Sequence, residues 1–186
     1  IIKVDGKGYM FPVASFVYPV FANLDLLKAA GIEAMPKNRT EFVEAARKLT
    51  DASKNQYGWV LPLSLEAPNG IQNDVMSWLW ASGKSMLKDG QPDLTNQDVV
   101  GTLEFVKSMY DEGLISPGTL AKKEQDKVEE FVNGRVGMMV DSLAHINLIR
   151  ERNPDLKFGI TAVPAVEGYD GPRGLPYASW GIGVSE

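Results

Sequence analysis

Residues 128–142 read Val-Glu-Glu-Phe-Val-Asn-Gly-Arg-Val-Gly-Met-Met-Val-Asp-Ser, and this stretch decides the fold class. Its first part carries apolar residues at helical spacing and stops at Gly134, while the apolar run 136–140 is typical of a short buried strand. Asp141 or Ser142 can cap a further helix. A helix, a buried strand and another helix in direct succession predict an α/β fold.

The same alternation continues outward on both sides of this stretch. Its patterns predict helices at 24–30, 38–49, 75–83, 95–113 and 141–152, and strands at 57–63, 158–163 and 177–184. Asn38 and Glu41 have the spacing of a capping box, and Thr95 is the expected cap of the long helix. At the start of the chain, residues 1–4 and 9–13 are expected to pair as a hairpin. We expect parallel strands with a few antiparallel ribbons.

Composition excludes several classes of protein. The chain has 186 residues, 44% of them hydrophobic, with a net charge of −5, no cysteine and one histidine. The acidic balance argues against nucleic acid as a partner. The missing cysteines exclude disulfides and thiolate chemistry, and no apolar run is long enough for a membrane helix. We therefore expect a soluble domain with no metal ion and no cofactor.

Three patterns that could indicate catalysis have plainer explanations. Gly83-Lys84-Ser85 resembles the end of a phosphate-binding loop, but Trp78 occupies the position of the required first glycine. Asp141, Ser142 and His145 fall within one turn, where they are better explained as a helix cap and first turn than as a catalytic triad. Gly181-Ile182-Gly183 has no helix after it. We predict no catalytic residue.

Aromatic and amide side chains are the remaining candidates for function. They gather at turns and element ends, where a ring can stack on the apolar face of a sugar and amides can bind its hydroxyls. Trp59 and Trp80 are expected in the core, whereas Trp78 and Trp180 fit a core or a binding role equally well. The full set is Ser15, Tyr18, Trp59, Asn69, Gln72, Asn73, Trp78, Trp80, Tyr177 and Trp180.

A series of short motifs runs through the whole chain in a fixed order. They are Asp5-Gly6-Lys7-Gly8-Tyr9 with Phe11-Pro12, Asn23 to Gly31, Pro36 with Glu41 to Leu49, Tyr57-Gly58, Trp78 to Gly83, Gly113 to Thr119, and Phe131 to Met138. Together they resemble the extracellular solute-binding proteins of ABC importers, in the sugar-binding group that includes maltose-binding protein.

This resemblance implies a fold and a division of the chain. Such proteins consist of two α/β lobes joined by hinge strands, with the solute held between them. Residues 1–15 would be a strand of the N-terminal lobe and the first hinge, and 16–161 a three-layer αβα C-terminal lobe of the type II periplasmic-binding-protein class. Residues 162–186 would be the second hinge and the return into the N-terminal lobe. Most of the N-terminal lobe and any export signal would lie outside this chain.

The resemblance also implies a function. The protein would capture a carbohydrate or similar polar solute in the periplasm or at the outer membrane face, either free or as a lipoprotein, and deliver it to the permease subunits of an ABC transporter. Ala144 stands where the family often has a sugar-stacking tryptophan, which leaves Trp78 or Trp180 for that role. The expected ligand-binding residues are Ser15, Phe16, Asn69, Gly70, Gln72, Asn73, Trp78, Asp141, Ser142 and Trp180.

Two further expectations remain open. A carbohydrate-active enzyme could use the same aromatic surface, but it would need two carboxyl groups facing each other across one cleft, about 5–9.5 Å apart. The apolar strands 9–13 and 177–184 need a partner as well. They would pair with each other or with a second chain, and we expect self-association in solution.

Overall fold

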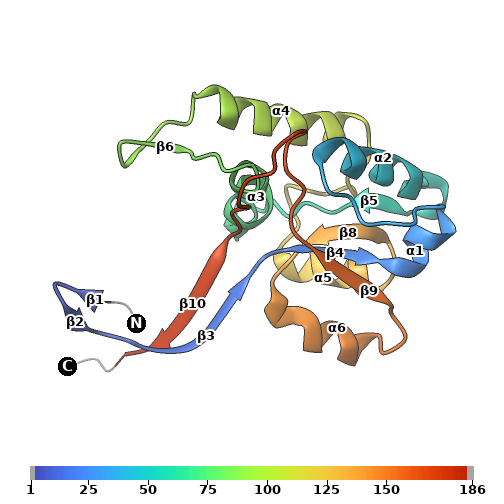
Figure 1. Ribbon diagram of the computed structural model, residues 1–186. Coiled ribbons are helices and arrows are strands. Elements are labelled where there is room, and N and C mark those ends of the chain that lie inside the picture. The colour runs from blue at the N-terminus through green and yellow to red at the C-terminus, as the bar shows by residue number, and fades with distance from the viewer. Residues whose placement is uncertain (1–2, 184–186) are drawn as a thin grey trace.

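A computed structural model describes residues 3–183, which form a rounded body and a ribbon that projects from it (Figure 1). The centre of the body is a four-stranded sheet in the order β5-β8-β4-β9. Its strands are β4 (Val20–Asn23), β5 (Tyr57–Trp59), β8 (Val136–Val140) and β9 (Phe158–Thr161). This sheet confirms the α/β class.

Helices cover both faces of the sheet, with α2 and α4 above it and α5 and α6 below it in Figure 1. The α-helices are α1 (Leu24–Ala29), α2 (Arg39–Leu49), α3 (Met76–Trp80), α4 (Gln97–Asp111), α5 (Glu124–Val132) and α6 (Ile146–Arg152). Shorter turns are the 3-10 turns η1 (Ala52–Lys54) and η3 (Leu143–His145) and the π-helical turn η2 (Ile71–Val75). The body is therefore a three-layer αβα sandwich.

Alternation along the strands builds the two layers of core. Ala22 and Met138 pack with α2, α3 and α4, while Phe21 and Met139 pack with α5 and α6, and all four are fully buried. Because successive side chains of a strand point to opposite faces, an uninterrupted apolar strand needs apolar cover on both sides. The run 136–140 meets this condition, as the sequence predicts.

The strand directions differ from the expectation of a mainly parallel sheet. Only β5 and β8 run parallel, whereas β4 is antiparallel to both β8 and β9. The chain enters β4 from the ribbon strand β3 (Phe11–Val17), and the sheet neighbours of β4 are β8 and β9, which lie far along the chain. No single strand–helix–strand crossover therefore joins β4 to a neighbour and places the two in parallel.

Side-chain caps set most helix starts where the sequence places them. Asn23 Oδ1 accepts hydrogen bonds from the backbone N–H groups of the first turn of α1. At α2, Asn38 Oδ1 accepts from Glu41 N, while the Glu41 carboxylate accepts from Asn38 Nδ2 and from Lys37 N instead of from the Asn38 backbone N–H, so the predicted capping box forms only in part. The prediction for Thr95 is wrong by one residue, because Asn96 caps α4 by accepting from Val99 N at 2.9 Å.

The ribbon consists of β3 and β10 (Tyr177–Ile182), which pair antiparallel from Tyr177 opposite Val17 to Ile182 opposite Phe11. At its far end, β1 (Lys3–Val4) pairs with β2 (Lys7–Gly8). The predicted partner of the first strand, 9–13, instead joins β10. Residues 1–2 and 184–186, which the predicted hairpin and last strand include, lie outside the described part. A small hairpin pairs β6 (Leu87–Lys88) with β7 (Gln91–Pro92).

The segment 162–176 packs on the body before the chain reaches β10. Val163 and Ala165 are buried in the core, and Arg39 N donates to Ala165 O at 2.9 Å. Glu167 accepts a hydrogen bond from Thr40 N at the start of α2. By its contacts this segment therefore belongs with the body, although the sequence-based boundary at residue 161 assigns it to the other lobe.

Candidate functional site

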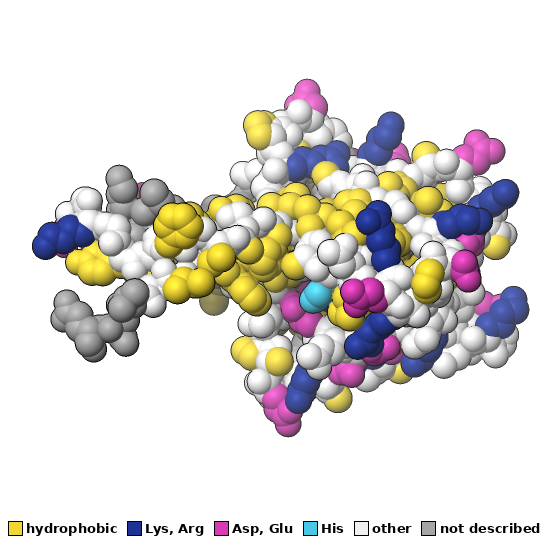
Figure 2. Space-filling view, turned by 90° about the horizontal axis from the view of Figure 1, so that it is seen from below, with side chains coloured by type: hydrophobic (Ala, Val, Ile, Leu, Met, Phe, Trp, Pro, Cys, Tyr) yellow, Lys and Arg dark blue, Asp and Glu magenta, His cyan; other side chains and the backbone are white. Residues whose placement is uncertain are grey.

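The ribbon meets the body at a face built from the ends of several elements. β10 arrives beside α3, and the turn η3 contacts β3. Figure 2 shows a band of hydrophobic side chains that continues from the ribbon onto the body, with the single imidazole of the chain at its edge beside acidic side chains. Aromatic surface and polar groups thus adjoin each other at this junction.

Aromatic rings cover the ribbon side of the junction. The ring of Phe16 lies 5.8 Å from that of Trp180 in an edge-to-face arrangement and 6.1 Å from that of Tyr18. Trp180 remains 67% exposed and Tyr177 63% exposed. Ser15 Oγ accepts a hydrogen bond from the Tyr177 hydroxyl at 2.8 Å. The ribbon therefore presents open aromatic faces beside fixed hydroxyl groups.

Amide side chains lie on the π-helical turn η2 and the bend before it. Asn69 and Gln72 are exposed, whereas Asn73 is 7% exposed and donates from Nδ2 to Glu124 Oε1 at 2.7 Å. Gly70 is required here, because a Cβ at this position would lie 1.6 Å from the carbonyl oxygen of Pro62. Close backbone packing thus fixes the turn that carries the amides.

A buried group of charged side chains underlies the junction, and we call Asp74, Lys127, Asp141 and His145 the charge cluster. Lys127 Nζ lies 3.3 Å from both carboxylate oxygens of Asp74 and 3.4 Å from Asp141 Oδ1. It also donates to the carbonyl oxygen of Val140 at 2.6 Å. Asp141 Oδ2 lies 2.9 Å from His145 Nδ1.

Burial and neighbouring charges shift the proton affinities of these groups. Burial raises the pKa of Asp74 to about 7, although Lys127 opposes the shift. Burial also disfavours the charged form of Lys127, but Asp74 and Asp141 outweigh this effect and raise its pKa above the usual value. The hydrogen bond to Asp141 raises the pKa of His145, although partial burial opposes it. The protonated forms of Asp74, Lys127 and His145 are therefore all favoured relative to the same groups in water.

The predicted ligand-binding residues are distributed over the elements near this junction. Ser15, Phe16 and Trp180 lie on the ribbon, and residues 69–73 on the turn. Asp141 and Ser142 follow β8, but both are buried, with 0% and 3% exposure. Ser142 Oγ accepts from Ala144 N at 3.1 Å, the capping role that the sequence predicts.

Trp78 does not reach the junction. Its ring is fully buried and packs against Phe42 at 4.7 Å, Phe105 at 5.0 Å and Trp59 at 5.5 Å between ring centroids. The turn η2 leads into α3 with Trp78 facing the core and Trp80 half-exposed. A ring without exposed surface does not stack on a solute, so Trp78 is a core residue.

Sequence reasoning missed Asp74, Lys127 and Glu124. A signal for Lys127 was present, because it lies four residues before Phe131 and so shares the buried face of α5. A lysine at an inward position needs a buried anionic partner. The identity of that partner, Asp74, depends on a contact between segments that are far apart in the chain.

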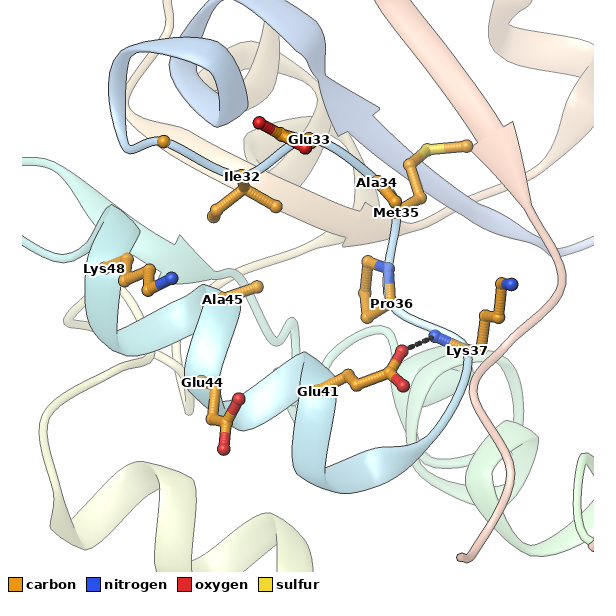
Figure 3. Close-up of a pocket in the computed structure, with 11 residues that line it drawn as sticks. Ile32, Glu33, Ala34, Met35, Pro36, Lys37, Glu41, Glu44, Ala45 and Lys48 are labelled. Carbon is orange, nitrogen blue, oxygen red and sulfur yellow. Dashed lines mark hydrogen bonds between the residues drawn. The ribbon is translucent and has the colours of Figure 1, made fainter. Parts of the chain in front are cut away.

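A separate pocket of about 460 Å³ lies at the side of the body away from the ribbon, between the loop 31–37 and α2 (Figure 3). Glu41 and Glu44 line it. Glu41 Oε2 accepts from the backbone N–H of Lys37 at 2.7 Å, the contact drawn in Figure 3. Because its carboxylate caps α2, Glu41 is held in a structural role, and none of the predicted site residues lines this pocket.

The αβα body and the projecting two-stranded ribbon thus meet at a face that combines aromatic and polar side chains. The model of the family described as bacterial extracellular solute-binding proteins matches residues 1–186. The chain belongs to this family. Within residues 3–183, no helix combines the length and the apolar character needed to cross a membrane.

Relatives of known sequence carry names that fit this family. The chain is 34% identical over 174 residues to a protein of Brucella abortus (strain 2308) that is named as a binding protein, covering 92% of this chain and 41% of that one. It is 27% identical over 172 residues to the lipoprotein LipO of Bacillus subtilis (strain 168), covering 84% and 34%.

Solved structures show the same fold. An ABC transporter solute-binding protein of Agrobacterium radiobacter K84 in complex with ribitol superposes with a TM-score of 0.85 at 27% identity, over 98% of this chain and 45% of that one. A solute-binding protein of Agrobacterium vitis S4 with bound D-mannitol gives 0.81 at 26% identity, over 98% and 44%. This chain thus spans less than half the length of these relatives.

Proposed function

We propose that this chain is the C-terminal lobe, with both hinge strands, of the substrate-binding component of an ABC importer for a polyol or sugar. The observation that carries the proposal is the exposed Trp180 ring on β10, a strand that begins beside α3, the helix into which the amide-bearing turn 69–73 leads. Aromatic faces bind the apolar side of a sugar ring or polyol chain, and amides bind hydroxyls as both donors and acceptors. Ribitol and D-mannitol, bound by two relatives, have this chemistry.

The division into lobes follows the two ribbon strands. We place the first hinge in β3, at the end of the segment 1–15 assigned from sequence to the other lobe. We place the second hinge in β10, after 162–176, because Val163 and Ala165 are buried in the body. The C-terminal lobe would then extend from about residue 16 to 176 rather than to 161.

Binding would work by closure about these hinges. Solute bound to both lobes contacts more groups in the closed state than in the open one, so it shifts the population toward closure. Trp180, Asn69 and Gln72 are the exposed groups of this lobe that would make such contacts. The buried Asn73 would hold its neighbours in position through its hydrogen bond to Glu124.

We propose binding without catalysis. A glycoside-active site needs two carboxyl groups facing each other across an open cleft. The carboxylates of Asp74 and Asp141 at the junction both face Lys127 and have no exposed side-chain surface. They are therefore out of reach of a substrate, and no arrangement among the described residues favours the enzyme over the binding protein.

The partners and location follow from the same proposal. The closed protein would dock on the permease subunits of its transporter from the outer side of the membrane, as a free periplasmic protein or a lipoprotein. The exposed apolar side chains of the ribbon, such as Phe11 at 78% and Ile182 at 66%, would contact the other lobe in the longer protein. A chain limited to these residues would self-associate through them.

Thermal shift measurements on the full-length protein with a panel of polyols, sugars, amino acids and peptides test the proposal. A ligand that binds only the folded state raises the melting temperature, and the shift grows as the ligand concentration exceeds its Kd. We expect a shift with at least one polyol or sugar. A shift with peptides or amino acids alone would contradict the proposal.

A further inference from the structure

The charge cluster has an unequal number of positive and negative groups. Asp74, Lys127 and Asp141 have no exposed side-chain surface, while the His145 side chain is 31% exposed. Two carboxylates thus face one buried ammonium group. Excess charge without water or a partner is costly in a protein interior. A proton on Asp74, whose pKa burial raises to about 7, or a second positive charge would balance the cluster.

His145 is the group that can supply this charge by taking up a proton. Its Nδ1 lies 2.9 Å from Asp141 Oδ2, within hydrogen-bonding distance. The other oxygen of this carboxylate, Oδ1, is buried and meets no hydrogen-bond donor among residues 3–183. Only Lys127, at 3.4 Å, faces it. An imidazolium at His145 therefore pairs with a carboxylate that is otherwise incompletely neutralised.

Other ionisable groups face His145 from the surrounding elements. Glu124 at the start of α5 favours its protonated form, whereas Lys127 opposes it. Asp74 on η2 adds negative charge behind Asp141, and Tyr18 contributes a hydroxyl whose pKa burial raises. The strand β3 carries no ionisable side chain. The carboxylates outnumber the ammonium group, so the local field favours a proton on His145.

The cluster is joined to the ribbon at the point where β3 leaves the body. His145 ends the turn η3, which contacts β3. The backbone N–H of Asp141 donates to the carbonyl oxygen of Pro19, between β3 and β4, at 3.0 Å. A change in the pairing of Asp141 with His145 therefore acts on both segments that hold the base of the ribbon.

We propose that His145 is a proton-dependent positioning residue of the hinge: its imidazolium, paired with Asp141, holds η3 against β3, and loss of the proton loosens this contact. If the proposed function holds, solute binding covers the junction and removes water from the cluster. The balanced, protonated form is then favoured in the closed state, so affinity rises as pH falls. Each unit by which solute raises the His145 pKa corresponds to a tenfold change in affinity.

An NMR titration of the full-length protein tests the proposal without a solute. His145→Gln identifies the resonance, and because glutamine can still donate to Asp141, it serves as the non-titrating control. We expect the imidazole to titrate above 6.5, the ordinary value. Amide resonances of residues 14–18 and 142–146 should move with the same midpoint, and should not move in His145→Gln. A His145 midpoint at or below 6.5 would overturn the proposal. So would amide resonances of residues 14–18 that do not shift as His145 titrates.

Asp141→Asn supplies a second, independent variant. Removing this carboxylate should lower the midpoint of His145, because the hydrogen bond to Asp141 is the main cause of its raised pKa. An unchanged midpoint would contradict the pairing. Calorimetry with ribitol and D-mannitol between about pH 5.5 and 8.5 then tests the link to binding. The affinity should fall as pH rises in the wild type and should not change with pH in His145→Gln. Absence of binding at every pH would count against the proposed function, while the titration still decides the role of His145.

Discussion

The two tryptophans that sequence alone could not separate should respond in opposite ways to truncation. Trp78→Ala removes a fully buried ring that packs on Phe42, Trp59 and Phe105. Truncations of this kind cost about 3–5 kcal/mol, because the lost burial adds to the cost of the cavity that remains. Trp180→Ala removes a ring that is 67% exposed and touches Phe16 edge-to-face. Its effect on stability should be about 1 kcal/mol or less.

Guanidinium unfolding of the full-length protein measures both values, with solute binding as the second readout. Trp78→Ala should lower the unfolding midpoint strongly, with the slope unchanged. Trp180→Ala should leave the midpoint nearly unchanged but weaken binding of a polyol or sugar by roughly two- to tenfold, the value of one aromatic contact. Trp78→Phe should lie between wild type and Trp78→Ala. Equal losses of stability in the two alanine variants would refute the assignment of Trp78 to the core and Trp180 to the site.

Three further variants test the packing, the charge cluster and a cap. Gly58→Ala would place a Cβ 2.4 Å from Ala46 Cα, so we expect about 1–3 kcal/mol of destabilisation in chemical unfolding. The matched control is Gly101→Ala in α4, where the Cβ would meet open space, and this variant should stabilise the protein by about 0.5–1 kcal/mol. Because burial raises the pKa of Asp74 from 3.8 to about 7, folding takes up a proton between these values; unfolding free energy should therefore fall as pH rises through this range, and Asp74→Asn should flatten that part of the profile. Asn38→Ala removes the bond that its Oδ1 accepts from the first turn of α2, so it should cost about 1 kcal/mol in urea unfolding; no loss would contradict the cap.

Local signals in the sequence were enough to predict most helices and the central strand. Asn23 and Asn38 cap the first turns of their own helices, and the uninterrupted apolar run 136–140 identifies a strand buried on both faces. Both features can therefore be recognised from the local sequence alone. The direction of β4 could not be predicted in this way. It depends on pairing with β8 and β9, which lie far along the chain from β4.

The candidate site, too, combines features that the local sequence predicts with features that depend on contacts between distant segments. Burial of Trp78 follows from how the turn η2 sets the phase of α3, and exposure of Trp180 follows from its place on the ribbon strand β10; a local pattern alone reveals neither. The charge cluster joins η2, α5 and the end of β8, and these segments meet only in the folded protein. A lysine on the apolar face of α5 was its single local sign.

The central claim is that this lobe holds a polyol or sugar at the junction of its ribbon and body. Isothermal titration calorimetry of the full-length protein with the solute that the thermal panel identifies tests it most directly, with Trp180→Ala and the remote pocket variant Glu44→Ala compared with the wild type. We predict binding of one solute per protein, weakened by Trp180→Ala and unchanged by Glu44→Ala. Full affinity in Trp180→Ala together with a loss in Glu44→Ala would contradict it, because the solute would then bind in the pocket beside α2.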